Sequence, residues 1–192
     1  MSYETIRGRR SYATHEISPI MEHQNERNRL STALAFAAGL RAHELATICR
    51  YSDMTPSNHR EWDDRLFLGM TDVKIYVVVG KGGLRRKVAI PTKLAAILDE
   101  RRFENPQRTT DRGVIYWRWY DIGFGQAFSQ SFSTASTRAL GFSRGAHGLR
   151  HSYTKARTAT LRELGLTFSE AQIVVSQELG HFRQSITIAY YR

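Results

Sequence analysis

The sequence predicts one mainly helical α+β domain with a small antiparallel sheet at one edge. Apolar residues recur at helical spacing in several segments, beginning with 28–38. Residues 72–79 are rich in β-branched side chains, and a glycine turn separates them from the apolar segment 84–90, which is typical of a β-hairpin. The 192 residues are 41% hydrophobic and contain no repeat or low-complexity tract, so we expect a single core.

The N-terminal part is expected to contain an arm followed by two helices. Residues 1–15 are polar, basic and aperiodic, which is typical of a loose arm or a linker remnant. A helical pattern begins near Ile17, and the alanine-rich stretch 28–38 predicts a buried helix that Gly39 ends. A second helix is predicted from Arg41, with three residues facing inward: Leu45, Ile48 and Cys49.

The middle of the chain predicts a β region. Residues 65–70 are expected to form a short strand, and residues 72–79 a central strand. The glycines of Gly80-Lys81-Gly82-Gly83 permit positive φ angles, so this segment predicts a tight turn with Lys81 at its tip. The return strand is expected over 84–90.

The C-terminal half is expected to be mostly helical. Thr92 is predicted to cap a helix that ends near Arg102, and residues 105–111 to form a polar loop. Residues 114–117 fit either a strand or a buried turn. Four further helices are predicted, at 126–140, 146–164, 169–179 and 184–191.

The charge balance favours an anionic partner. The 28 lysines and arginines exceed the 18 acidic residues and leave a net charge of +10. Such a surplus indicates nucleic acid first and an acidic membrane surface second, although a merely basic soluble protein has the same composition. Cys49 is the single cysteine, which excludes an intramolecular disulfide, and no apolar run reaches the length of a membrane span. We therefore expect a cytoplasmic protein without a membrane partner.

Three groups of residues have the chemistry of a phosphate site. His147 and Arg150 lie three residues apart at a predicted helix start, so they share one face. Arg41 and Glu44 have the same spacing and form either a surface ion pair or an arginine that a carboxylate aims at a ligand. Lys81 is either a solvated turn residue or a mobile cation that reaches a substrate. None of these patterns is decisive alone.

These groups belong to an ordered set of five features: Gly39-Leu40-Arg41-Ala42-His43-Glu44-Leu45, Gly80-Lys81-Gly82, His147-Gly148-Leu149-Arg150-His151, Leu179-Gly180-His181 and Tyr190. With this order the chain resembles the catalytic domain of the tyrosine recombinase, or phage integrase, family. The resemblance covers residues 28–192. Residues 1–27 are then an arm or linker remnant plus the entry to the first helix, and the family's N-terminal core-binding domain is absent.

The resemblance implies a role for each matching residue. Arg41 and Arg150 are expected to clamp the scissile phosphate, and Tyr190 to be the nucleophile, although Tyr191 directly follows it. Three further catalytic residues are implied: Lys81, His147 and His181. Two residues are expected to support them: Glu44 and His151. Four basic residues are expected to contact DNA: Arg85, Arg86, Lys87 and Arg144.

The implied activity is site-specific DNA cleavage and rejoining through a 3′-phosphotyrosyl intermediate, in the integration or excision of a mobile element. Arginines would stabilise the charge that develops on the phosphate, so no metal or cofactor is expected. The expected partners are double-stranded DNA and further copies of the chain. A tetramer is expected for the full-length protein and a monomer for this chain alone. When it is bound to DNA, the protein is expected to be associated with the nucleoid.

Two departures from the family pattern leave the activity open. Residues 55–64 are an insertion between Arg41 and Lys81, which either contacts DNA or only decorates the surface. Without a core-binding domain, DNA binding is expected to be weak and strongly salt-dependent.

Relaxation of supercoils in the manner of a type IB topoisomerase is an alternative activity. A non-catalytic DNA-binding relative also fits the sequence, as does a basic helical module without a DNA role.

Overall fold

The computed structural model describes residues 10–182, and the predicted helix at 184–191 lies outside this range. The helices are α2 (Thr14–Glu22), α3 (Glu26–Ala38), α4 (Thr92–Glu100), α5 (Gly125–Leu140), α6 (His147–Glu163) and α7 (Phe168–Glu178). The strands are β1 (Cys49–Arg50), β2 (Val73–Val79), β3 (Arg85–Pro91), β4 (Arg102–Asp111) and β5 (Val114–Tyr120). Two short 3₁₀ helices are η1 (Glu44–Thr47) and η2 (Lys81–Gly83). The predicted helical α+β class is confirmed.

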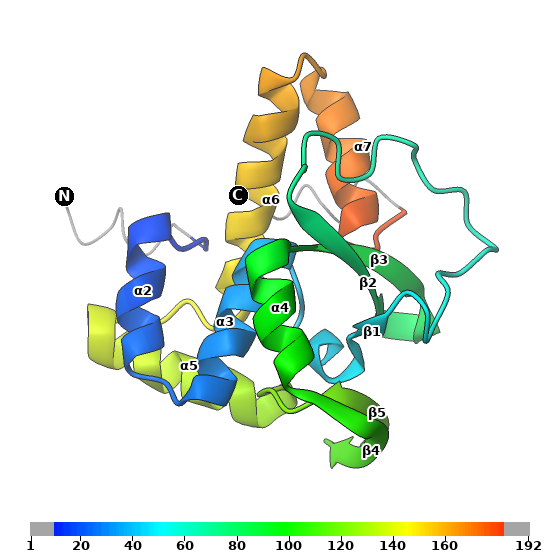
Figure 1. Cartoon of the computed structure of the whole chain (residues 1–192). Coiled ribbons are helices and arrows are strands. Elements are labelled where there is room, and N and C mark those ends of the chain that lie inside the picture. The colour runs from blue at the N-terminus through cyan, green and yellow to red at the C-terminus, as the bar shows by residue number, and fades with distance from the viewer. Residues whose placement is uncertain (1–9, 183–192) are drawn as a thin grey trace.

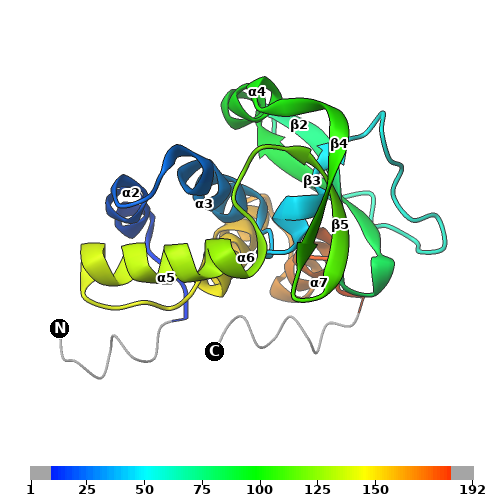
Figure 2. The same cartoon turned by 90° about the horizontal axis from the view of Figure 1, so that it is seen from below.

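The helices and the sheet form two sides of the molecule (Figure 1). Helix α3 packs against α6, α2 packs against α5, and α7 packs against α6. The antiparallel sheet β1-β2-β3 lies on the other side with α4 against it. The separate hairpin β4-β5 projects beside this sheet and contacts η1, as Figure 2 shows from below.

Two clusters of apolar side chains hold the fold together. The larger cluster joins the helices to the sheet and includes Leu34, Ile48, Val78, Phe132 and Leu149. The smaller cluster lies between α6 and α7 and includes Tyr153, Leu161, Val174, Val175 and Leu179. Helix α6 contributes side chains to both clusters, so packing against both of them fixes its position.

The predicted hairpin of the sheet is confirmed. Strands β2 and β3 pair with Val77 opposite Lys87, and the amide of Gly80 donates to the carbonyl of Leu84 across the turn. Gly82 has a φ of 74°, in the left-handed region that favours glycine. This turn holds Lys81 at the end of the sheet, where the side chain is exposed.

Three predicted elements differ in the structure. The second helix is reduced to η1, because Cys49 is extended and pairs with Val77 of β2. Residues 65–70 form turns instead of a strand, and the amide of Phe67 donates to the Glu178 carboxylate of α7. The polar segment 105–111, predicted as a loop, belongs to β4, because β5 supplies its backbone hydrogen bonds.

The described part of the N-terminal arm packs on the helical core, in contrast to the predicted loose arm. Tyr12 is buried, and its amide donates to Ser152 Oγ of α6 at 2.9 Å. The segment crosses α6 at Gly148, where an added Cβ would lie 2.6 Å from the Tyr12 ring and 2.9 Å from the Arg10 carbonyl oxygen. Glycine is therefore required for this close approach.

Within residues 10–182, no helix has the length and apolar character needed to cross a membrane.

Candidate active site

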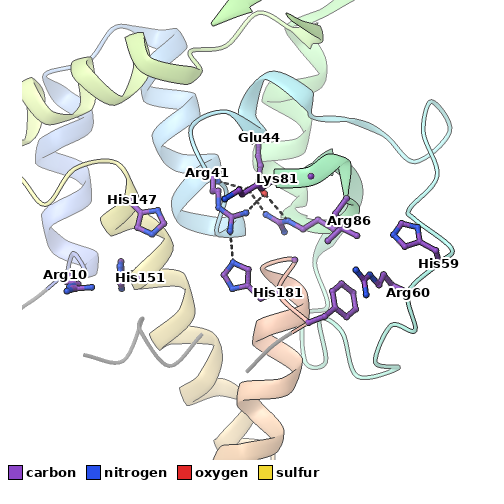
Figure 3. A pocket seen from close by; sticks show the side chains of 15 residues that line it. Arg10, Arg41, Glu44, His59, Arg60, Lys81, Arg86, His147, His151 and His181 are labelled. Atoms are coloured by element: carbon purple, nitrogen blue, oxygen red, sulfur yellow. Dashed lines mark hydrogen bonds and ion pairs between the residues drawn. The ribbon is translucent and has the colours of Figure 1, made fainter. Parts of the chain in front are cut away.

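An open cavity of about 940 Å³ lies where η1, the β2-β3 turn, the start of α6 and the end of α7 converge (Figure 3). Ten of the residues that line it carry basic or titratable side chains: Arg10, Arg41, Glu44, His59, Arg60, Lys81, Arg86, His147, His151 and His181. Arg41, Lys81 and His147 come from segments that are far apart in the sequence. The fold thus brings together three of the five sequence features in one cavity, and His181 adds a fourth.

Glu44 is the acidic centre of this site. Its side chain is fully buried, and its Oε2 accepts from the Arg41 amide at 2.8 Å. Its Oε1 accepts from Arg41 Nη1 at 3.0 Å, and its Oε2 accepts from Arg86 Nη2 at 2.8 Å. Arg150 Nη1 lies 3.5 Å from Oε2. One carboxylate therefore orients three guanidinium groups.

The three arginines also set the protonation state of Glu44. Burial alone would raise the pKa of Glu44, but the charges of Arg86, Arg150 and Arg41 outweigh this effect. The pKa of Glu44 is consequently held well below its usual value. Glu44 is ionised at neutral pH, and this ionised state keeps the arginines in place.

Arg41 and His181 form a direct contact at the cavity wall. Arg41 Nη2 lies 2.6 Å from His181 Nε2, and because a guanidinium can only donate, this nitrogen accepts. Burial and the charges of Arg150 and Arg41 lower the pKa of His181 to about 3. His181 is therefore a neutral imidazole that holds the Arg41 guanidinium at the cavity.

Arg150 lies beneath the cavity, not on its wall. Its side chain is fully buried and donates to the carbonyl oxygens of Gly39, at 2.6 Å, and Leu179. It also lies 3.5 Å from His181 Nε2. Arg150 thus ties the segment before Arg41 to the segment before His181, and its role as a phosphate clamp, which the resemblance implies, stays a prediction.

His147 is the first residue of α6 and is exposed at the cavity mouth. Its ring stacks edge to face on His151, one turn later, with 5.3 Å between the centroids. Partial desolvation and the charges of Arg150 and His151 lower the pKa of His147 to about 4. His147 is therefore a neutral base at a helix N-terminus, where backbone amides favour an anion.

The four basic residues predicted to contact DNA lie in different surroundings. Arg85 is exposed on β3, and Lys87 lies 5.8 Å above the Tyr51 ring. Arg86 is buried and donates to Glu44 and to the Glu178 carbonyl, so its position supports a structural role instead of a DNA contact. Arg144 pairs with Glu16 and covers the Phe142 ring, which holds it against the N-terminal segment.

The cavity is also lined by three residues that the sequence did not place among the catalytic or supporting residues. His59 and Arg60 line it from the insertion, and Arg10 lines it from the N-terminal segment (Figure 3). The basic composition of residues 1–15 was the only sequence signal for Arg10, whereas residues 55–64 hold one arginine, one histidine and three acidic residues and gave no charge signal for His59 and Arg60. These residues are far from the motifs along the chain, and only the packing of the fold brings them to the same cavity.

Tyr190 and Tyr191 lie outside the described residues, so the structure assigns no position to either nucleophile candidate. Among residues 10–182, no group of three or more histidine, cysteine or acidic side chains is arranged to hold a metal ion.

Comparison with solved structures shows the fold to which this arrangement belongs. A post-cleavage complex of the XerH site-specific recombinase with its difH substrate matches with a TM-score of 0.57 and 19% identity, over 94% of this chain and 48% of that one. A pre-cleavage XerH complex matches with a TM-score of 0.57 and 18% identity, over 94% of this chain and 49% of that one. The integrase from mycobacterium phage Brujita matches with a TM-score of 0.38 and 20% identity, over 93% of this chain and 57% of that one.

No protein-family model and no curated protein matches the sequence. The chain spans about half the length of the XerH chains that it resembles. The XerH structures match nearly the whole of this chain, and the cavity lies where the fold brings the sequence motifs together. The chain therefore has the fold of a tyrosine recombinase catalytic domain.

Proposed function

We propose that this chain is the catalytic domain of a site-specific DNA recombinase or integrase that cleaves and rejoins strands through a 3′-phosphotyrosyl intermediate. The observation that carries the proposal is the cavity in which Arg41, Lys81, His147 and His181 meet around a buried carboxylate. A cavity of this composition fits a phosphodiester, because its accessible side chains are hydrogen-bond donors or neutral bases.

The arginines supply the electrostatic part of the reaction. Attack on a phosphodiester adds negative charge to its non-bridging oxygens in a pentacoordinate arrangement. The Arg41 guanidinium is oriented by Glu44 and His181 before substrate arrives, so little reorganisation is needed when this charge develops. A direct contact from Arg150 would require its Nη groups to leave the carbonyl oxygens of Gly39 and Leu179. In its present position Arg150 aligns Arg41 with His181.

The proton transfers follow from the protonation states. A tyrosine hydroxyl with a pKa near 10 is a weak nucleophile, and we assign the acceptance of its proton to His147. The lowered pKa of His147 makes it a weak base by itself, and the negative charge of a bound phosphate raises that pKa and strengthens the base. The Tyr190 oxygen then forms the bond to phosphorus while the bond to the 5′ oxygen breaks. Lys81 donates a proton to that leaving oxygen from the exposed turn. Reversal by a 5′-hydroxyl of another strand rejoins the DNA.

The remaining parts of the proposal concern assembly and biological role. Strand exchange between two duplexes needs several active sites, so we propose a homo-oligomer on DNA, a tetramer in the full-length protein. Integration or excision of a mobile element, on nucleoid DNA in the cytoplasm, is the proposed setting.

The test is covalent capture on a nicked suicide substrate, from which the rejoining end diffuses away. We expect a protein–DNA adduct that survives denaturation, that Tyr190→Phe abolishes and that Tyr191→Phe retains. Persistence of the adduct in Tyr190→Phe would refute the choice of nucleophile. Absence of any adduct with the unmodified chain and a cognate site would refute the proposed activity. Relaxation of a supercoiled plasmid without strand exchange would favour the topoisomerase-like activity instead.

A further inference from the structure

We propose that the insertion, residues 55–64, provides a second DNA-backbone subsite, in which Arg60 with His59 binds a phosphate that flanks the scissile one. This inference rests on the proposed function and extends it. The sequence allowed the insertion to be either an extra loop against DNA or surface decoration. Four structural observations favour the first.

The insertion is attached to the fold on both sides of His59 and Arg60. Before them, Ser57 is buried; its amide donates to the Arg85 carbonyl at 2.9 Å, and its Oγ accepts from the Arg85 amide at 3.1 Å. After them, the Asp63 amide donates to Gln177 Oε1 of α7 at 2.7 Å. These bonds fasten the segment to β3 and α7, so His59 and Arg60 are presented from a bridge with two fixed ends.

An aromatic contact attaches the middle of this bridge to the cavity rim. The Trp62 ring packs edge to face on Phe182, with 5.0 Å between the centroids, and the Trp62 indole donates to the Ser57 carbonyl at 2.9 Å. Arg60 lies over the same Phe182 ring, 5.2 Å from its centroid. Phe182 directly follows His181 in the chain, so the contact with Phe182 holds Arg60 near the proposed catalytic residue His181.

The guanidinium of Arg60 is available to an anion. Within residues 10–182, Arg60 has no carboxylate partner, whereas Arg65 of the neighbouring turn pairs with Asp63 at 2.7 Å. Arg60 is exposed and lines the cavity, and the adjacent Glu61 does not line it. A guanidinium that is weakly hydrated, stacked on an aromatic ring and not neutralised is well suited to a phosphate oxygen pair.

The location of the subsite defines its place along a DNA strand. In Figure 3, His59 and Arg60 lie on one side of Arg41 and His181, and His147 lies on the other. All five side chains line one open cavity. A DNA strand whose scissile phosphate lies at Arg41 would continue in one direction toward Arg60. Phosphates repeat along each strand, so a second contact reads no sequence and increases salt-dependent affinity.

The experiment measures binding of a fluorescently labelled, mixed-sequence duplex by the full chain over a series of salt concentrations. Each phosphate contact contributes about 0.9 to the slope of log K against log salt concentration. We expect Arg60→Ala to reduce the slope by about 0.9 and Arg60→Lys to restore most of it. The matched control is Arg138→Ala, which removes the same charge from an exposed site at the end of α5, away from the cavity.

The outcomes separate this inference from the proposed function. Slopes that are equal for Arg60→Ala and the unmodified chain would refute the subsite, and adduct formation on the suicide substrate would still support the activity. Equal losses in Arg60→Ala and Arg138→Ala would also refute it, because only general charge would be involved. Absence of salt-dependent binding by the unmodified chain would overturn both proposals. Thermal unfolding of each variant is measured alongside, since Arg60 is exposed and its replacement should leave the midpoint unchanged.

Discussion

Replacement of Glu44 by glutamine is the most direct test of how the site is held together. The substitution keeps the shape of the side chain and removes the charge that three arginines share. Breaking a buried ion pair by removing one partner costs about 3–5 kcal/mol, because the remaining charges stay buried without compensation. Arg86 and Arg150 are almost completely buried, so we expect Glu44→Gln to reach this range.

Urea unfolding followed by circular dichroism measures this loss. With a denaturant slope of about 2 kcal/mol per molar, the midpoint is expected to fall by roughly 2 M. Glu26→Gln is the matched control, because Glu26 pairs with Arg101 at 2.8 Å while 81% of its side chain is exposed. That variant should lose less than about 1 kcal/mol. A loss in Glu44→Gln no larger than in Glu26→Gln would refute the central role of the carboxylate.

The pH dependence of the same pair of proteins gives an independent check. The pKa of Glu44 is depressed from its usual 4.5, so its ionised form stabilises the fold fully above that value. As pH falls below about 4.5, the unfolded chain takes up a proton that the folded chain excludes, and this stabilisation declines. The difference in unfolding free energy between the unmodified chain and Glu44→Gln should therefore be constant above about pH 5 and shrink below it. A difference that persists unchanged at pH 3 would contradict the assigned ionisation.

Three further predictions address the hairpin, the N-terminal crossing and His181. Lys81→Ala should change the unfolding free energy by less than about 0.5 kcal/mol, because the side chain is exposed, and should slow adduct formation about 10²- to 10⁴-fold; equal adduct rates would exclude Lys81 as the proton donor. Gly148→Ala should lose about 1–3 kcal/mol in urea unfolding, because the new Cβ would lie 2.6 Å from the Tyr12 ring; an unchanged midpoint would contradict this close contact. The pKa of His181 is lowered from 6.5 to about 3, so stability is complete above pH 6.5 and falls as the unfolded chain is protonated between those values. That change corresponds to at most about 5 kcal/mol. His181→Asn should lack this part of the pH dependence, and identical profiles for the two proteins would show that His181 does not titrate as assigned.

Local sequence patterns predicted the elements that are determined by nearby residues. Residues 73–79 have the β-branched composition of a strand, and the glycine turn after them returns the chain to β3. Gly39 and Gly141 end α3 and α5 with φ angles of 62° and 76°, as their positions after apolar helical runs predicted. In these segments the backbone preference and the burial pattern agree, so the sequence is sufficient.

Elements that depend on distant partners were not predicted. The polar segment 105–111 became a strand because β5 pairs with it, and polarity was misleading in a hairpin whose strands carry many exposed side chains. The helix expected after Arg41 stops at η1 because Cys49 pairs with β2. Residues 65–70 lost their expected strand because Glu178 of α7 binds the Phe67 amide. In each case a contact over long sequence distance overrode local preference.

The sequence by itself determined the residue types of the site and their order along the chain, because arginine, lysine and histidine carry their chemistry wherever they are placed. The helical α+β class was also determined at this level, through periodicity and glycine positions. Only the tertiary structure decided which basic groups face the cavity. Arg86 and Arg150 are buried against the Glu44 carboxylate, whereas Lys81 and Arg60 are exposed. The tertiary structure also lowers the pKa values of His147 and His181. Exposure, charge pairing and pKa depend on neighbours that packing brings from distant segments, and no local pattern encodes them.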